Sequence, residues 1–172
     1  MIDAVLDPTV IVARARDEAR RLSAATNWSP AFAGASAQTP LLVKLLDTVD
    51  KYYYLVGFSV GDRVTARLEI DAYTGHYAEG IGIGKLGDKI PPYTTPAAAY
   101  RLMVTVLTAA ANKKKQKGPL PTIAIDPFYG WKPCAQSLSS FLPFYVIYVG
   151  ENTRYVRVDG KVYDALTYGA GL

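Results

Sequence analysis

A pattern that occurs twice, about ninety residues apart, constrains the fold of this chain more than any other feature. Asp7-Pro8 and Thr95-Pro96 each place a capping side chain before a proline, a combination typical of a helix start. In both cases a helical stretch follows and then two strands joined by a tight turn. These strands are predicted at 52–59 and 63–71 in the first copy and at 143–149 and 153–159 in the second. The sequence therefore predicts a duplicated fold.

Composition places the chain among globular proteins. Of its 172 residues, 50% are hydrophobic and 20% are charged, so the chain can bury a core without disulfides. We expect an α+β fold of two similar halves, each a helix packed on an antiparallel sheet, which could form one pseudo-symmetric unit. The expected division is a first half at 1–84, a linker at 85–95, and a second half at 96–172 with an insertion at 127–142.

The two predicted helices differ in their apolar surface. The first, at 8–22, has one apolar face formed by Ile11, Ala15, Ala19 and Leu22. The second, from Pro96 to about Asn112, is apolar on nearly every side. That pattern predicts a helix more completely buried than the first, between the two halves or at a dimer contact.

Strand and turn signals in the sequence predict the structure of the remaining segments. Residues 27–40 and 113–121 are predicted as loops, each followed by a short strand, at 41–46 and 122–125. Gly61-Asp62 is a favoured tight-turn pair, and Asp159-Gly160 signals a type I′ turn. In the strand 63–71, apolar and polar residues alternate, which predicts an apolar face directed inward and a polar face directed outward.

The insertion at 127–142 is the least repeat-like part of the chain and is rich in aromatic residues. Tyr129, Trp131 and Phe141 are the best candidates for a binding surface, because function is often carried by loops on a rigid scaffold. The alternative is that the insertion folds back and covers the open face of the second sheet. We favour this packing interpretation.

The segment Asp71-Ala72-Tyr73-Thr74-Gly75, together with the strands around it, resembles the core of the PepSY family. The resemblance covers about 8–79, with a fainter second copy at 96–166 in which Asp159-Gly160 forms a shorter turn. Asp71, Gly75, Asp159 and Gly160 are the structural turn residues, with Asp71 binding nearby amides and Gly75 at positive φ. The resemblance implies small α+β units for which a role in restraining peptidases has been proposed. It implies no catalytic residues.

The sequence offers no strong catalytic or cofactor motif. Cys134 and His76 could act as nucleophile and base, but a lone cysteine is more often a small buried hydrophobe. The glycine-rich stretch 80–87 is not followed by a helix, so it is interpreted as part of a linker rather than a phosphate-binding loop. With one cysteine and one histidine, no metal site and no cofactor are expected. Aspartates recur at the predicted strand ends and are interpreted as turn formers: Asp47, Asp50, Asp71, Asp126 and Asp159.

The net charge and the hydropathy of the chain limit the classes of partner that we expect. The net charge is +4, but the one dense basic cluster, at 113–117, fits the end of a helix, so nucleic acid is not expected as a partner. The apolar, uncharged stretch 102–112 is too short to insert into a membrane. Residues 1–8 do not resemble a secretory signal, which leads us to expect a cytoplasmic protein.

Three functions remain open. The preferred one is a non-enzymatic module that binds a protein or peptide, by strand addition to an exposed sheet edge, and that could modulate a peptidase. The second is a small-molecule-binding protein or enzyme with a pocket between helix and sheet, lined by Tyr54, Phe58, Trp131 and Tyr148. The third is a structural component of a larger assembly, with a homodimer as one arrangement.

Overall fold

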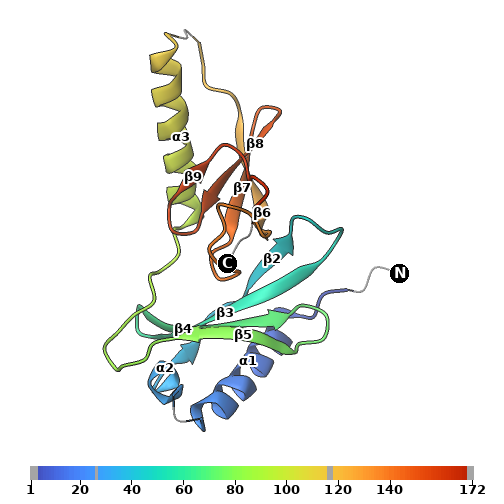
Figure 1. Ribbon diagram of the computed structural model, residues 1–172, viewed down its shortest axis with the longest axis vertical. Coiled ribbons are helices and arrows are strands. Elements are labelled where there is room, and N and C mark those ends of the chain that lie inside the picture. The colour runs from blue at the N-terminus through green and yellow to red at the C-terminus, as the bar shows by residue number, and fades with distance from the viewer. Residues whose placement is uncertain (1–3, 26, 116–117, 170–172) are drawn as a thin grey trace. The chain divides into compact units, whose positions relative to one another are not determined.

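The computed structural model describes residues 4–25, 27–115 and 118–169 and has an α+β fold with mostly antiparallel sheet (Figure 1). The chain divides into two compact units, Met1–Pro92 and Tyr93–Leu172. The division therefore falls within the segment 85–95. Each unit has its own cluster of buried hydrophobic residues.

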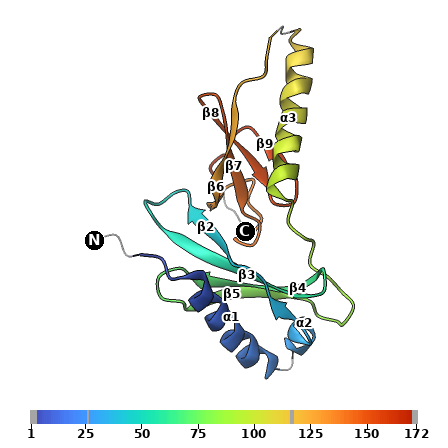
Figure 2. The same ribbon diagram turned by 180° about the vertical axis from the view of Figure 1, so that it is seen from behind.

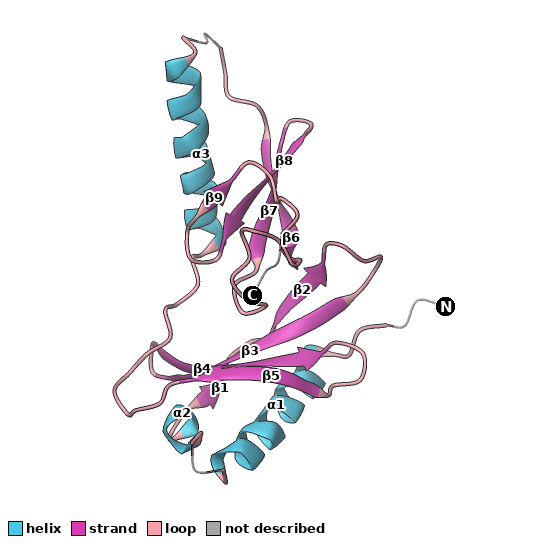
Figure 3. Ribbon diagram, in the orientation of Figure 1, coloured by secondary structure: helices cyan, strands magenta, loops and turns pink. Residues whose placement is uncertain are grey.

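The first unit begins with helix α1 (Pro8–Ser23) and the single-turn helix α2 (Ser29–Phe32). Its strands are β1 (Ser36–Ala37), β2 (Leu41–Leu45), β3 (Tyr52–Val60), β4 (Arg63–Asp71) and β5 (Tyr77–Gly82). Strands β2 to β5 pair antiparallel in chain order, and β1 pairs with β3 beyond the end of β2. Both helices lie on the same face of this sheet, as Figures 2 and 3 show.

Helix α1 starts where the capping signal predicts. The Asp7 side chain accepts a hydrogen bond from the Thr9 backbone N–H at 2.8 Å, and Pro8 occupies the first turn, where a missing N–H costs nothing. The predicted apolar face is buried and packs against β3 and β4 residues such as Tyr54 and Leu68. Burial of this stripe fixes the helix on the sheet.

The β3–β4 hairpin is closed by Gly61 and Asp62. Gly61 has a φ of 59° and Asp62 does not have a positive φ, which fits a type II′ turn. The polar residues of β4 differ from the expectation that they point to solvent. Thr65 and Arg67 are buried, and their polar groups bond the carbonyl oxygens of Phe58 and Pro91. Hydrogen bonding to backbone makes this burial tolerable.

The glycine-rich stretch is partly strand rather than linker. Gly80 and Gly82 belong to β5, opposite the large side chain of Trp28. A Cβ atom would lie 3.1 Å from the Trp28 ring at position 80 and 2.9 Å at position 82. Glycine is therefore needed here so that the indole can lie close to the strand.

The second unit consists of helix α3 (Pro96–Lys113) and strands β6 (Ile123–Trp131), β7 (Phe144–Val149), β8 (Asn152–Arg157) and β9 (Val162–Tyr163). The strands pair antiparallel in chain order, β6 to β9. The Thr95 hydroxyl caps α3 by accepting from the Ala98 N–H at 3.2 Å. Gly150, with a φ of 59°, begins the turn between β7 and β8.

The predicted end of the strand at Ile125 is wrong, because β6 continues through Trp131. Pairing with β7 is interrupted between Ile125 and Tyr129, where the register shifts. Pro127 lies in this interruption, and a proline cannot donate to a strand ladder. The local signal of Pro127 thus marks a bulge rather than the end of the strand. Residues 127–131 of the predicted insertion are part of the sheet.

Within the single chain, α3 is less buried than expected, and the expected contact in a dimer stays a prediction. Among its described residues only Ala99 and Met103 are buried, whereas Tyr100 is 43% and Val106 40% exposed. The C-terminal end of α3 extends past the β7–β8 turn, where no sheet lies beneath it (Figure 1), whereas Tyr100 is exposed near the N-terminal end of the helix. Helix α3 is therefore apolar on nearly every side but is packed on only part of its surface.

The loop at Asp159-Gly160 is not a type I′ turn. Gly160 has a φ of 90°, but Asp159 does not have a positive φ, which type I′ requires at both central residues. Asp159 instead turns its carboxylate onto the guanidinium of Arg157, at 2.9 and 2.7 Å. The Gly160 N–H donates to the Arg157 carbonyl at 2.7 Å, so the central residues of this turn are Val158 and Asp159 rather than Asp159 and Gly160.

Candidate functional site

The three aromatic residues proposed for binding lie in different surroundings. Phe141 is 3% exposed, which leaves little of its ring for a partner. Trp131 is half-buried at the end of β6, and its indole N–H donates to the Ser139 carbonyl at 2.9 Å. Tyr129 is half-buried against Tyr145, with ring centroids 4.9 Å apart. For these residues a role in binding stays a prediction.

Tyr145 links this pair to the start of α3. Its hydroxyl donates to the Thr94 carbonyl oxygen, so the Tyr129 hydroxyl, 3.2 Å away, donates to the Tyr145 oxygen. Burial raises the pKa of Tyr145, and the hydrogen bond with Tyr129 raises it further. Tyr145 therefore stays protonated and acts as a structural donor.

The segment 132–143 packs back onto the second unit. The Arg157 guanidinium is buried and donates to the Gln136 carbonyl at 2.6 Å, while the Gln136 side chain binds Thr167. Cys134 is fully buried, and its N–H and carbonyl both bond the Ser137 hydroxyl. These contacts hold the segment against β8, which is the arrangement expected of a cover over the sheet.

The turn after β4 is built around the Asp71 carboxylate. It accepts from the Tyr73 N–H at 3.0 Å and from the Thr74 N–H at 2.7 Å. Burial alone would raise the pKa of Asp71, but the hydrogen bonds from Thr74 and Tyr73 lower it overall. Gly75 follows at a φ of 72°, and its N–H donates to the Asp71 carbonyl at 3.0 Å. The hydrogen bonds from Tyr73 and Thr74 all reach Asp71 Oδ1, as expected of a residue that forms a turn.

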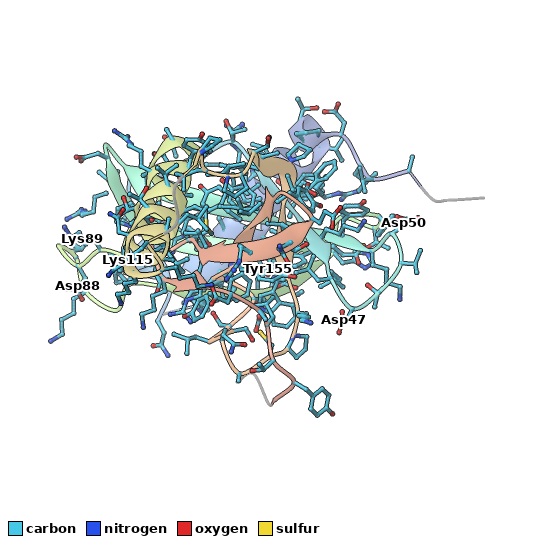
Figure 4. All side chains as sticks on the ribbon, turned by 90° about the horizontal axis from the view of Figure 1, so that it is seen from above. Asp47, Asp50, Asp88, Lys89, Lys115 and Tyr155 are labelled. Carbon is cyan, nitrogen blue, oxygen red and sulfur yellow. The ribbon has the colours of Figure 1, made fainter. Side chains whose placement is uncertain are left out.

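The remaining polar candidates lie on separate elements of the two units. His76 is exposed after the turn in the first unit, whereas Cys134 is buried in the second unit. Asp47 and Asp50 lie on the loop between β2 and β3 (Figure 4), and Asp126 binds the Tyr148 hydroxyl at 2.8 Å. Within residues 4–25, 27–115 and 118–169, no group of three or more His, Cys, Asp or Glu side chains could hold a metal ion.

The residues proposed to line a small-molecule pocket belong to both units. Tyr54 is buried in the core of the first unit, and Tyr148 of the second unit is 42% exposed. Phe58 is buried but lines a cleft on the first unit, together with residues that the sequence analysis did not select.

This cleft, of about 470 Å³, lies between α1 and the outer side of β1. Phe32 and Phe58 contribute aromatic surface and contact each other edge to face, with centroids 5.0 Å apart. The other lining residues come from α1 and from the segment around β1: Arg16, Ala19, Arg20, Ser23, Ala35, Ser36 and Ala37. The cleft is hence apolar inside and polar along α1.

Backbone groups of β1 also lie beside this cleft. Gln38 N–H donates to the Gly57 carbonyl at 2.8 Å, and the register pairs Ala37 with Phe58 and Ser36 with Ser59. In an antiparallel pair, hydrogen-bonded and non-hydrogen-bonded residues alternate. Since Gln38 bonds to β3, Ala37 directs its N–H and carbonyl away from β3, at the open edge of β1. The first unit thus presents a short sheet edge next to a helix.

The electrostatics of the cleft are positive. Two arginines line it and, among the described lining residues, none is acidic. Arg20 forms an exposed ion pair with Asp17, whereas Arg16 forms no ion pair with another residue in the described part of the chain. A cation beside an open backbone edge is suited to a ligand that combines peptide groups with negative charge.

Sequence reasoning missed this site because it treats residues 27–40 as loop. Pro30 in the first turn of α2 was the available signal for the short helix. No local pattern announces β1, which is only two residues long.

A second cleft, of about 380 Å³, lies in the second unit beside the C-terminal half of α3. Leu107, Ala110 and Ala111 form its helix side, and the β7–β8 turn with residues 118–121 forms the other. It is the space left where α3 extends beyond its sheet.

No helix in the described residues is both long and apolar enough to cross a lipid bilayer. Comparison with protein-family models, with curated proteins and with solved structures found no match to this chain.

Proposed function

We propose that this protein is a non-enzymatic module that binds an extended protein or peptide segment by strand addition at the open edge of β1. The observation that carries the proposal is the outward-directed backbone of Ala37, which lines a cleft whose opposite wall is α1. A peptide strand laid along this edge gains main-chain hydrogen bonds, while the wall of the helix receives its side chains.

The residues that line the cleft favour peptide binding over catalysis. Phe32, which is only partly buried, offers apolar surface to one peptide side chain, and the buried Phe58 ring supports it from behind. The residues with catalytic potential, Cys134 and His76, do not line the cleft. With only two residues in β1, few backbone hydrogen bonds form, so we expect micromolar rather than nanomolar affinity.

The test begins with selection of peptides from a random display library on the full chain. Hydrogen exchange should then show protection of the Ala37 amide in the complex. Ala37→Pro removes the outward N–H and should abolish binding while leaving the β1–β3 hydrogen bonds in place. Selected peptides that protect another region, or that bind Ala37→Pro as well as the unaltered protein, would contradict the proposal.

We further propose that the two units are tandem repeats of one PepSY-like fold. Both begin with a helix and contain four strands that pair in chain order, β2–β5 and β6–β9, although the first unit also has α2 and β1. The N-cap residues Asp7 and Thr95 are 88 positions apart, and the hairpin glycines Gly61 and Gly150 are 89 positions apart with the same φ of 59°. An experimental structure tests this: superposition of α1 and β2–β5 on α3 and β6–β9 should align the two glycines, and an alignment out of register would refute common descent.

A second candidate function is self-association through α3, as part of a homodimer or larger assembly. Its observation is the exposed apolar surface of this helix, including Tyr100 and Val106. Light scattering coupled to size-exclusion chromatography should give a dimer that Val106→Lys converts to a monomer. A monomer at all concentrations for the unaltered protein excludes this candidate.

A further inference from the structure

From the charge of the cleft we infer that the peptide segment recognised at β1 is acidic, with carboxylate side chains that pair with Arg16 and Arg20. This inference rests on the proposed function, since it names the ligand class for the same site. Arg16 and Arg20 lie on the α1 wall, opposite the backbone edge of Ala37, and the described lining contains no carboxylate.

The spacing of the two arginines matches that of side chains on an added strand. Residues four apart on a helix have Cβ atoms roughly 6 Å apart. On a β-strand, alternate residues point to the same face and are separated by roughly 6.6 Å. Two acidic side chains at alternate positions of a bound strand are consequently spaced to meet Arg16 and Arg20 in turn.

Arg16 and Arg20 are both available to bind a ligand carboxylate. Arg16 has no ion-pair partner among the described residues, and the ion pair between Arg20 and Asp17 is exposed on both sides. Exposed pairs of this kind are weak, so a ligand carboxylate can share or replace Asp17 at little cost. The planar guanidinium group also suits two-point contact with a carboxylate.

Charge complementarity distinguishes this ligand from the alternatives. A basic segment would meet two like charges, and a neutral segment would leave Arg16 without a counter-ion.

The experiment uses the full chain and a fluorescent, amidated octapeptide, Thr-Val-Thr-Glu-Thr-Glu-Thr-Val, whose capped end removes the terminal carboxylate. Analogues carry glutamine or lysine in place of both glutamates. We expect the glutamate peptide to bind about threefold to tenfold more tightly than the glutamine peptide, and the lysine peptide most weakly. The difference should shrink as salt is raised, because the pairs are exposed.

Protein variants locate the effect. Arg16→Gln combined with Arg20→Gln should remove the preference for glutamate, and Arg16→Glu should reverse it in favour of lysine. Arg14→Gln is the matched control, since Arg14 is exposed on the same helix but does not line the cleft. If glutamate and glutamine peptides bind equally, and both lose binding in Ala37→Pro, the acidic ligand class is refuted while strand addition stands. If none of the three peptides binds, both the ligand class and strand addition are refuted.

Discussion

At the scale of single residues, a positive φ and a buried charge are the two features that most constrain which amino acid a position accepts. Gly75 and Gly61 are required by their positive φ values, which turn chemistry in the sequence indicates. Arg157 could not be foreseen, because its 2% exposure depends on Asp159 and on the Gln136 carbonyl being brought beside it by the fold. Local signals predict turns well, while the partners of a buried charge come from distant segments.

Gly75→Val should destabilise the protein by more than about 1 kcal/mol, because a β-branched residue resists positive φ. The added Cβ would also lie 3.2 Å from Leu6 Cδ1 and 3.3 Å from Arg14 Cγ. Gly75→Asn adds the same Cβ but tolerates the left-handed region, so it should cost less. Thermal melting of both variants measures the difference, and an unchanged melting temperature for the valine variant would contradict the prediction.

The pair of Arg157 and Asp159 should make stability depend on pH. The hydrogen bonds from Arg157 hold the pKa of Asp159 below its ordinary value of 3.8. A carboxyl with a lowered folded-state pKa stabilises the fold at pH values above its unfolded pKa, and this contribution is lost as the pH falls through the folded value. Asp159→Asn should therefore be less stable than the unaltered protein at pH 7, and the gap should close below pH 3.8.

Urea denaturation at several pH values measures that gap. Asp164→Asn is the control, because Asp164 forms an ion pair with Arg154 but its side chain is 80% exposed. A gap between Asp159→Asn and the unaltered protein that stays constant down to acidic pH would show that the Asp159 charge does not stabilise the fold.

At the scale of elements, the sequence predicts those whose signals are local and fails for those held by distant contacts. Helix α1 and the β3–β4 hairpin have caps, periodicity and a turn pair, and both were predicted within a residue of their bounds. Helix α2 and β1 are too short for a periodic pattern. They are held by the Phe32–Phe58 contact and by pairing with β3, which no local rule contains. Since the candidate cleft is built from these two elements, it could not be predicted.

The burial of α3 illustrates the other limit. Periodicity tells which side chains are apolar, but not how far a sheet extends beneath the helix. Met103 lies over the strands and is buried, whereas Val106, one turn further on, is 40% exposed.

The segment 132–143 should contribute stability as a cover of the second sheet. Trp131→Ala should cost about 3 kcal/mol, from lost burial and the lost hydrogen bond to the Ser139 carbonyl. Trp131→Phe keeps most of the packing and should cost about 1 kcal/mol. Leu138→Ala, at a residue 49% exposed in the same segment, should change stability by less than about 0.5 kcal/mol. Chemical denaturation gives all three values. Equal stability of Trp131→Ala and the unaltered protein would instead favour a binding role for Trp131.

At the scale of the whole molecule, the division into two units has consequences for folding. Among the described residues of the first unit, thirteen buried hydrophobic residues form one cluster, and they lie within 11–83. Its pairings join strands that are neighbours in the sequence, apart from the short β1–β3 contact. Such local topology favours rapid and autonomous folding.

We therefore predict that residues 1–92 fold alone. The fragment should melt in one cooperative transition, because α1 and the β3–β4 hairpin bring most of the core with them. Ile11→Ala in the fragment should cost about 2 to 5 kcal/mol, as in a packed core, whereas a loosely collapsed fragment would tolerate the change. Circular dichroism and amide dispersion in NMR spectra distinguish these outcomes. Because the β1 cleft is lined only by residues of this fragment, a folded fragment that fails to bind a peptide recognised by the full chain would separate folding from function and place the binding surface elsewhere.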